Sequence, residues 1–114
     1  MIVYEPFDVV EVPFPFSDSL TAKIRKALVI TPKTMNEKNQ ATTLMMITSR
    51  KNSQWIGDVE LERWTEAGLK KPCFVRFKFF TADNKLLRGK VGHLAQKDKE
   101  LVTSVLNKLL HGHG

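Results

Sequence analysis

Two polar residues beside apolar runs have the chemistry to act on a phosphodiester. Arg25 opens a run that continues to Ile30, and Thr48 closes a second run that begins at Leu44. If both runs are strands of one small barrel, a guanidinium and a hydroxyl meet at one edge. Arg25 can then hold two phosphate oxygens and stabilise the charge that develops on them, while Thr48 donates a hydrogen bond. The pair of residues therefore predicts a protein that acts chemically on a phosphodiester bond.

Each of these residues also has an ordinary explanation. Arg25 can be a surface or phosphate-binding arginine without a chemical role, and Thr48 can satisfy a nearby backbone group at the end of its strand. Neither segment contains a histidine, so an imidazole acid and base pair is not evident. The groups that move protons therefore stay unassigned.

A second basic set lies elsewhere in the chain. Arg76 and Lys78 alternate with phenylalanines, which places both cations on one face of a strand. Together with Arg50 and Lys51 they can follow a nucleic-acid backbone, with Phe16 or Trp55 for base stacking. A solvated lysine surface is the alternative, and the aromatic residues between the cations are expected to pack inward.

Composition favours a polyanionic partner and a reducing compartment. The 114 residues carry a net charge of +6, which suits nucleic acid or an acidic protein that competes for the same surface. The single cysteine, Cys73, excludes an intramolecular disulfide. We see no signal peptide and no apolar run near the roughly 18 residues that a membrane span needs. We therefore expect a soluble, cytoplasmic protein with no membrane partner.

The pattern of elements predicts a small, mostly β domain. Strands are expected at residues 8–12, 27–30, 41–48, 58–61, 74–80 and 86–94, with a loop or one helical turn at 33–40. Asp98 is expected to cap a final amphipathic helix that docks on the sheet with a leucine and valine stripe through Leu110. Short strands with one terminal helix favour an antiparallel barrel over a parallel α/β sheet.

The order of several short motifs resembles the MazF and PemK family of type II toxins. These motifs are Asp8-Val9-Val10, Phe14-Pro15-Phe16-Ser17-Asp18, Lys23 and Arg25 before Ala27-Leu28-Val29-Ile30, Ile47-Thr48-Ser49, Ala67-Gly68-Leu69-Lys70-Lys71-Pro72 and Gly92-His93-Leu94. The resemblance implies one SH3-like barrel of the PemK/CcdB type over residues 1–110, with 111–114 as a frayed tail. It also implies a homodimer that cleaves single-stranded RNA selectively at short sequences, without a metal or cofactor.

The resemblance also assigns site residues and partners. Arg25 and Thr48 match the catalytic positions. The residues expected to bind RNA are Lys23, Lys26, Ser17, Ser49, Arg76 and Lys78. An acidic antitoxin is expected to bind across the RNA groove, and operator DNA to be bound together with that antitoxin.

Four positions depart from the family pattern. Lys26 stands where proline is usual, Phe7 where glycine is frequent, Lys78 where many members have an aspartate, and Cys73 where serine is common. These departures keep a second hypothesis open, a weakened or non-catalytic module that binds antitoxin and operator DNA or nucleic acid in general. A gyrase-targeting toxin on the same barrel is a third, because fold does not determine function.

Overall fold

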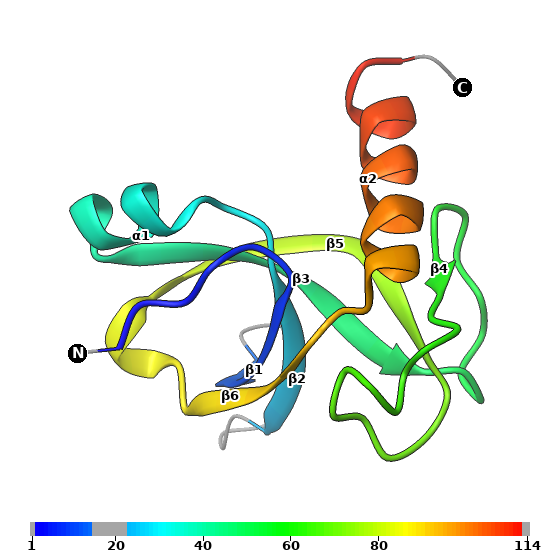
Figure 1. The fold of residues 1–114 in the computed structure, drawn as a ribbon, viewed down its shortest axis with the longest axis horizontal. Coiled ribbons are helices and arrows are strands. Elements are labelled where there is room, and N and C mark those ends of the chain that lie inside the picture. Colours follow the sequence, from blue (N-terminus) through cyan, green and yellow to red (C-terminus); the bar gives the residue numbers. More distant parts are fainter. Residues whose placement is uncertain (1, 15–22, 113–114) are drawn as a thin grey trace.

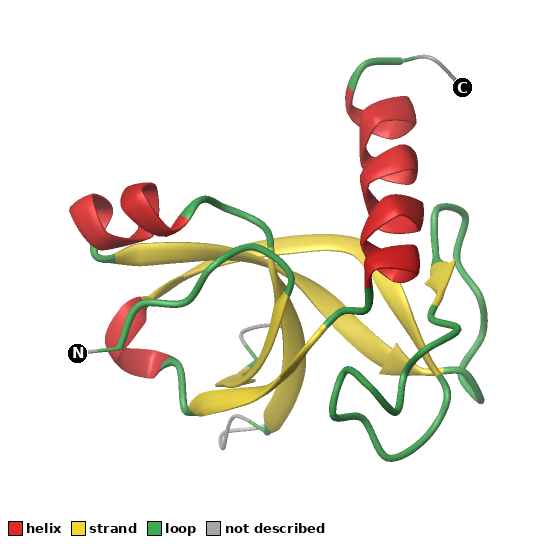
Figure 2. Ribbon diagram, in the orientation of Figure 1, coloured by secondary structure: helices red, strands yellow, loops and turns green. Residues whose placement is uncertain are grey.

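Six antiparallel strands form one curved sheet in the computed structural model, which describes residues 2–14 and 23–112. The elements are β1 (Asp8–Pro13), β2 (Ile24–Val29), α1 (Lys33–Asn39), β3 (Ala41–Ser49), β4 (Val59–Glu60), β5 (Cys73–Asp83), a short 3₁₀ turn η1 (Asn84–Leu86), β6 (Gly89–His93) and α2 (Gln96–Leu110). The strand order is β4-β5-β3-β2-β1-β6. Figures 1 and 2 show a mostly β fold with a C-terminal helix, as predicted.

Both faces of the central strands are buried, which explains why their sequences are continuously apolar. Val9 and Leu28 belong to one hydrophobic cluster, which also contains Val102 of α2. Their neighbours Val10 and Ala27 belong to a second cluster on the other face. The expectation that the run ending at Ile30 is a central strand is confirmed, because β2 lies between β1 and β3.

α1 is longer than the sequence pattern indicated. The segment was expected to be a loop or one turn, but it forms a helix of 7 residues. The reason is tertiary: the fully buried Asn36 donates hydrogen bonds to the carbonyl oxygens of Tyr4 and Thr31 and accepts one from the Thr31 hydroxyl. The bond to Tyr4, which is 32 residues away in the chain, fastens a polar helix that lacks an apolar stripe of its own.

α2 forms as predicted, but Asp98 does not cap it. The N-cap is Ala95, and the buried Asp98 carboxylate accepts hydrogen bonds from the backbone N–H groups of Glu62 and Arg63 at 3.0 and 2.9 Å. The helix also docks only in part. Val102 is buried, whereas Leu110 is 61% exposed, and Figure 1 shows the C-terminal half of α2 extending beyond the sheet.

A turn at residues 64–68 approaches β6 closely and leads the chain to the next segment, 69–73. Gly68 has a φ of +80°, and a Cβ built there would lie 2.3 Å from the carbonyl oxygen of Val91. Only glycine fits this contact without displacing the backbone. No helix in the described part of the chain has the length and apolarity to span a membrane.

Candidate functional site

The start of β2 and the end of β3 lie side by side because these strands are antiparallel neighbours. Ala27 pairs with Met46. Arg25 lies two residues before Ala27 and Thr48 lies two residues after Met46, so both are displaced toward the same end of the strand pair. Both residues line one open pocket at this end of the two strands. The structure therefore brings together the two residues that the sequence singled out.

The pocket has a volume of about 360 Å³. It is built from the first residues of β2, the last residues of β3, the loop that follows β3, and residues 69–73. The residues that line it are Ile24, Arg25, Lys26, Ile47, Thr48, Ser49, Lys51, Asn52, Leu69, Lys71 and Cys73. Leu69 reaches the pocket from the turn that Gly68 closes.

The charge of this pocket is one-sided. Four of its lining residues are basic, and none of its described lining residues is acidic. Within the described part of the chain, no carboxylate lies within 4.0 Å of the charged nitrogens of Arg25, Lys51 or Lys71, and Lys26 has only a 3.7 Å contact with the partly exposed Glu11. An unbalanced cluster of cations in a hollow attracts an anion such as a phosphate.

Two hydroxyl groups at the end of β3 face this cluster of cations. The Thr48 hydroxyl oxygen accepts a hydrogen bond of 2.8 Å from the side-chain amide of Asn52. The Ser49 hydroxyl oxygen accepts a longer bond of 3.4 Å from the backbone N–H of Lys51. The ordinary explanation of Thr48 was a hydrogen bond to a nearby backbone group. In the described residues its oxygen is instead bonded to a side chain that lines the same pocket.

Cys73 also lines the pocket, but it is not prepared to act as a nucleophile. Burial raises the pKa of its thiol, although Lys71 and Lys26 oppose that shift. The Sγ atom donates a hydrogen bond to the carbonyl oxygen of Lys71 at 3.2 Å. A thiol held in its neutral form is a weak nucleophile, so Cys73 contributes shape and apolar surface.

The other residues expected to bind RNA are distributed differently. Lys26 and Ser49 line the pocket, whereas the exposed Lys23 precedes β2 and does not. Ser17, like Phe16 and Asp18, lies outside the described residues. The RNA contacts assigned to all of these residues remain predictions.

Arg76 lies outside the pocket in a cluster of its own. Its side chain is buried and forms two hydrogen bonds with the Asp58 carboxylate, at 3.1 and 3.0 Å, and a third with the carbonyl oxygen of Ser53. The guanidinium stacks over Trp55 at 4.4 Å, and the Lys78 ammonium lies 5.7 Å from the same ring. The expected second basic set is therefore divided: Lys51 joins the pocket, and Arg50 pairs with Glu60.

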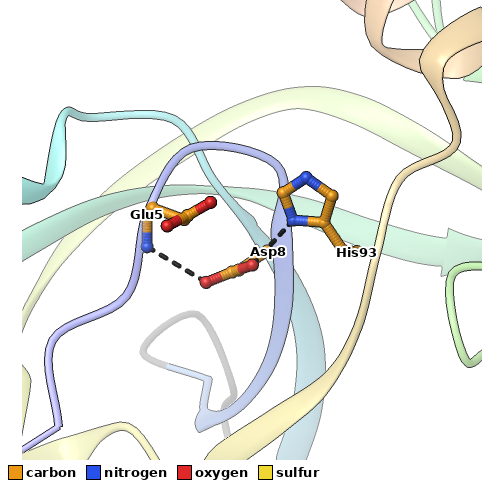
Figure 3. A group of neighbouring side chains, drawn as sticks. All are labelled: Glu5, Asp8 and His93. Atoms are coloured by element: carbon orange, nitrogen blue, oxygen red, sulfur yellow. Dashed lines mark hydrogen bonds and ion pairs between the residues drawn. The ribbon is translucent and has the colours of Figure 1, made fainter.

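A third polar cluster joins β1 to β6 (Figure 3). Asp8 accepts hydrogen bonds from the backbone N–H of Glu5 and from Nδ1 of His93, and the Lys90 ammonium lies 3.1 Å from the same carboxylate. Burial alone would raise the pKa of Asp8, but these three contacts outweigh it and lower that pKa. Glu5, Asp8 and His93 place metal-ligating atoms within 4.8 Å of one another, yet Lys90 already neutralises the buried carboxylate, so we assign this cluster a structural role.

Two polar residues of the pocket, Asn52 and Lys71, were not predicted from the sequence. Asn52 looked like one member of a polar loop, although its position four residues after Thr48 was a usable signal for a local hydrogen bond. Lys71 reaches the pocket because Cys73 pairs with Ser49 and the backbone N–H of Arg50 donates to the carbonyl oxygen of Pro72, which places the start of β5 beside the end of β3. Its approach depends on tertiary contacts that no local pattern records.

The comparisons with known proteins agree with this geometry. The model of the PemK-like, MazF-like toxin of type II toxin-antitoxin system matches residues 5–110. No curated protein matches the chain by sequence.

Solved structures share the fold at low sequence identity. A MazE-MazF complex from Deinococcus radiodurans has a TM-score of 0.76 at 18% identity and covers 96% of this chain and 98% of its own. The Mycobacterium tuberculosis toxin MazF-mt6 has a TM-score of 0.73 at 15% identity over 91% and 96% of the two chains. A mycobacterial endoribonuclease in complex with its cognate antitoxin has a TM-score of 0.73 at 10% identity over 97% and 96%.

The fold class predicted from the sequence, including its likeness to the SH3-like toxin barrel, agrees with these structures. At such low identity the structures show the fold alone. The family model covers most of the chain, and it matches the segments that build the pocket. The chain belongs to the PemK-like, MazF-like toxins of type II toxin-antitoxin systems.

Proposed function

We propose that this protein is a metal-independent endoribonuclease that cleaves single-stranded RNA at the pocket between β2 and β3. The observation that carries the proposal is that Arg25 and Thr48 line one pocket with three lysines and no acidic residue among its described lining. A site that binds the negatively charged backbone of RNA needs an excess of positive charge of this kind. The lining residues that the structure describes offer no carboxylate or imidazole to ligate a metal ion, which supports chemistry by side chains alone.

The reaction needs charge stabilisation more than a covalent protein group. The 2′-hydroxyl of the RNA gives its proton to solvent and attacks the neighbouring phosphorus. The bond to the 5′-oxygen breaks, this oxygen takes a proton from solvent, and the products are a 2′,3′-cyclic phosphate and a 5′-hydroxyl. Negative charge gathers on the non-bridging oxygens during this step. The exposed guanidinium of Arg25 can hold two of them, and the Thr48 hydroxyl can donate to one.

The lysines of the pocket have a different role in this proposal. Lys26, Lys51 and Lys71 lie around the pair and bring positive charge to the RNA backbone. Electrostatic contacts of this kind bind phosphates without reading sequence and depend on salt. They are expected to contribute to affinity, whereas Arg25 and Thr48 contribute to the rate.

The partners proposed for the protein follow its relatives. Structures described as a MazE-MazF complex and as an endoribonuclease with its cognate antitoxin share the fold. We propose an acidic antitoxin as the partner of this basic chain, whose net charge is +6. A homodimer, operator DNA bound together with the antitoxin, and a cytoplasmic location complete the proposal.

One observation favours a second candidate function. Among the described pocket residues none is a carboxylate or an imidazole, so none is a ready general base. A weakened toxin that binds antitoxin and nucleic acid without cutting would have such a pocket. The two functions differ in whether RNA is cut.

Cleavage in EDTA tests the proposal. A long single-stranded RNA is incubated with wild-type protein, with Arg25→Ala and with Arg63→Ala, and the ends are mapped by primer extension. Arg63 is the matched control, because it is an arginine outside the pocket that pairs with the exposed Glu66. Discrete cuts by the wild type and Arg63→Ala but not by Arg25→Ala are expected. Intact RNA that is still bound by the wild type would favour the non-catalytic module.

A further inference from the structure

The hydrogen bond between Asn52 and Thr48 has a direction that matters for catalysis. A threonine hydroxyl has one proton to donate and lone pairs that accept. Here the Asn52 amide nitrogen donates to the Thr48 oxygen at 2.8 Å, so the Asn52 bond uses a lone pair and leaves the hydroxyl proton to another acceptor.

The surroundings of Thr48 decide where that proton can point. In the described part of the chain, no acceptor for the Thr48 hydroxyl proton is found, and the described lining residues include no carboxylate. The pocket is rich in cations, which do not accept hydrogen bonds. A phosphate oxygen entering the pocket would be the first strong acceptor that the hydroxyl meets.

The position of Asn52 is itself held by the backbone. Its N–H donates to the carbonyl oxygen of Ser49 at 3.1 Å, which closes a turn directly after β3. Thr48 and Asn52 are therefore attached to the two ends of one short turn, and the side chain of Asn52 folds back over it. An exposed loop residue that makes such a local bond is unlike the buried asparagines of this fold, Asn36 and Asn84, which join distant segments.

We propose that Asn52 is a positioning residue that holds the Thr48 hydroxyl as a hydrogen-bond donor toward the scissile phosphate. This inference rests on the proposed ribonuclease function and adds a residue to it. Without the amide donor, the Thr48 hydroxyl rotates among its staggered positions and loses part of its alignment. A neutral hydrogen bond of this kind changes a rate by roughly three- to tenfold.

The existence of the bond can be tested without activity. In ¹⁵N-labelled protein the side-chain amide signal of Asn52, assigned by its loss in Asn52→Leu, is expected to shift in Thr48→Val. The amide signals of Asn36 and Asn84 are the internal reference and are expected to stay in place. An Asn52 signal that does not move in Thr48→Val would overturn the inference.

Kinetics then test the positioning role. Asn52→Leu has a similar shape and no donor, and it is expected to lower kcat three- to tenfold with KM within twofold. In a Thr48→Val background the same change is expected to have no further effect, because its effect passes through Thr48. A rise in KM alone, or an equal loss in both backgrounds, would show that Asn52 contacts RNA or the fold directly.

Reversal of the bond provides a second variant. Asn52→Asp offers only acceptors, so the Thr48 proton would point at the new carboxylate instead of the phosphate. We expect kcat to fall at least tenfold below that of Ser53→Asp, a control that adds the same charge one residue outside the pocket lining. Equal activity of the two aspartate variants would contradict the inference.

The outcomes separate this inference from the proposed function. Wild-type protein that cuts no RNA would overturn the ribonuclease function and with it this role. A wild type that cuts RNA, a Thr48→Val protein that cuts it measurably more slowly, and an Asn52→Leu protein that cuts at the wild-type rate would overturn the positioning role alone.

Discussion

Arg25 and Arg76 are both strand arginines of one basic chain, and the structure gives them opposite surroundings. Arg76 is 6% exposed and bonded to the carboxylate of Asp58, whereas Arg25 is exposed and has no carboxylate partner among the described residues. The charge of Arg76 is used inside the protein. The charge of Arg25 has no such internal partner among the described residues, and we propose that it serves an external anion together with the lysines of the pocket.

The same contrast separates the pocket from the Asp8 cluster. Asp8 is buried, but it is matched by His93 and Lys90. A buried charge persists only when it is paired, since desolvation otherwise costs several kcal/mol. An exposed charge can remain unpaired at little cost. The buried cation Arg76 is paired inside the protein, whereas the exposed cations Arg25, Lys51 and Lys71 have no carboxylate partner among the described residues and line one pocket.

The largest effect is expected from breaking the buried pair. Asp58→Ala would leave the Arg76 guanidinium buried without its carboxylate, and we expect the free energy of unfolding to fall by about 3–5 kcal/mol. Urea denaturation measures this loss. Glu60→Ala, which breaks the half-exposed pair with Arg50, is expected to cost less than about 1 kcal/mol. Equal denaturation midpoints for the two variants would remove the distinction between these pairs.

Arg25→Ala is expected to lower the rate of RNA cleavage strongly and to leave the stability of the protein nearly unchanged. Loss of a cation that acts on the transition state lowers a rate by about 100- to 1,000-fold. The side chain is exposed, so we expect the free energy of unfolding to change by less than about 0.5 kcal/mol. Single-turnover cleavage and urea denaturation of the same preparation measure both quantities. A variant that loses stability and activity together would place Arg25 among the structural arginines.

The Asp8 cluster predicts a pH dependence of stability. Because the folded pKa of Asp8 is lowered from 3.8, its contribution is fully present above that pH and is lost as the pH falls through the folded pKa. Asp8→Asn is expected to cost about 1–2 kcal/mol at pH 7, and the gap to the wild type should narrow below about pH 4. Thermal unfolding between pH 7 and pH 3 measures the gap.

The control for Asp8 is Glu5→Gln. Glu5 joins the cluster through its backbone N–H, so its exposed carboxylate is not needed for the bond to Asp8. Its stability is expected to follow the wild type across the same pH range. A gap between Asp8→Asn and the wild type that stays constant to pH 3 would argue against a titrating Asp8.

The smallest effect concerns single lysines of the pocket. Lys71→Ala is expected to weaken binding of a 2′-O-methyl single-stranded RNA, which cannot be cut, and to reduce the slope of log K against log salt by about 0.7. Lys38→Ala removes an exposed lysine of α1 outside the pocket and is expected to leave the slope unchanged. Fluorescence anisotropy over a salt series measures both. Identical slopes would show that RNA does not pass Lys71.

Much of the fold followed from local patterns. Apolar runs at residues 27–30 and 41–48 predicted two strands, and their antiparallel pairing was enough to bring Arg25 near Thr48. Helix α2 was expected from its period. Its capping was predicted wrongly because the Asp98 carboxylate has a distant partner, the backbone at Glu62 and Arg63. A short acidic side chain at a helix start has the same sequence signature in either case.

The sequence by itself determined the strand periods, the excess of positive charge and the residue types at the ends of β2 and β3. Tertiary structure decided which cations stay unpaired. Arg76 met Asp58 across 18 residues, and Lys71 reached the pocket because the start of β5 pairs with the end of β3. The physical reason is that periodicity reports which face of an element is buried, whereas the pairing of charges depends on distances between segments that only the folded chain brings together.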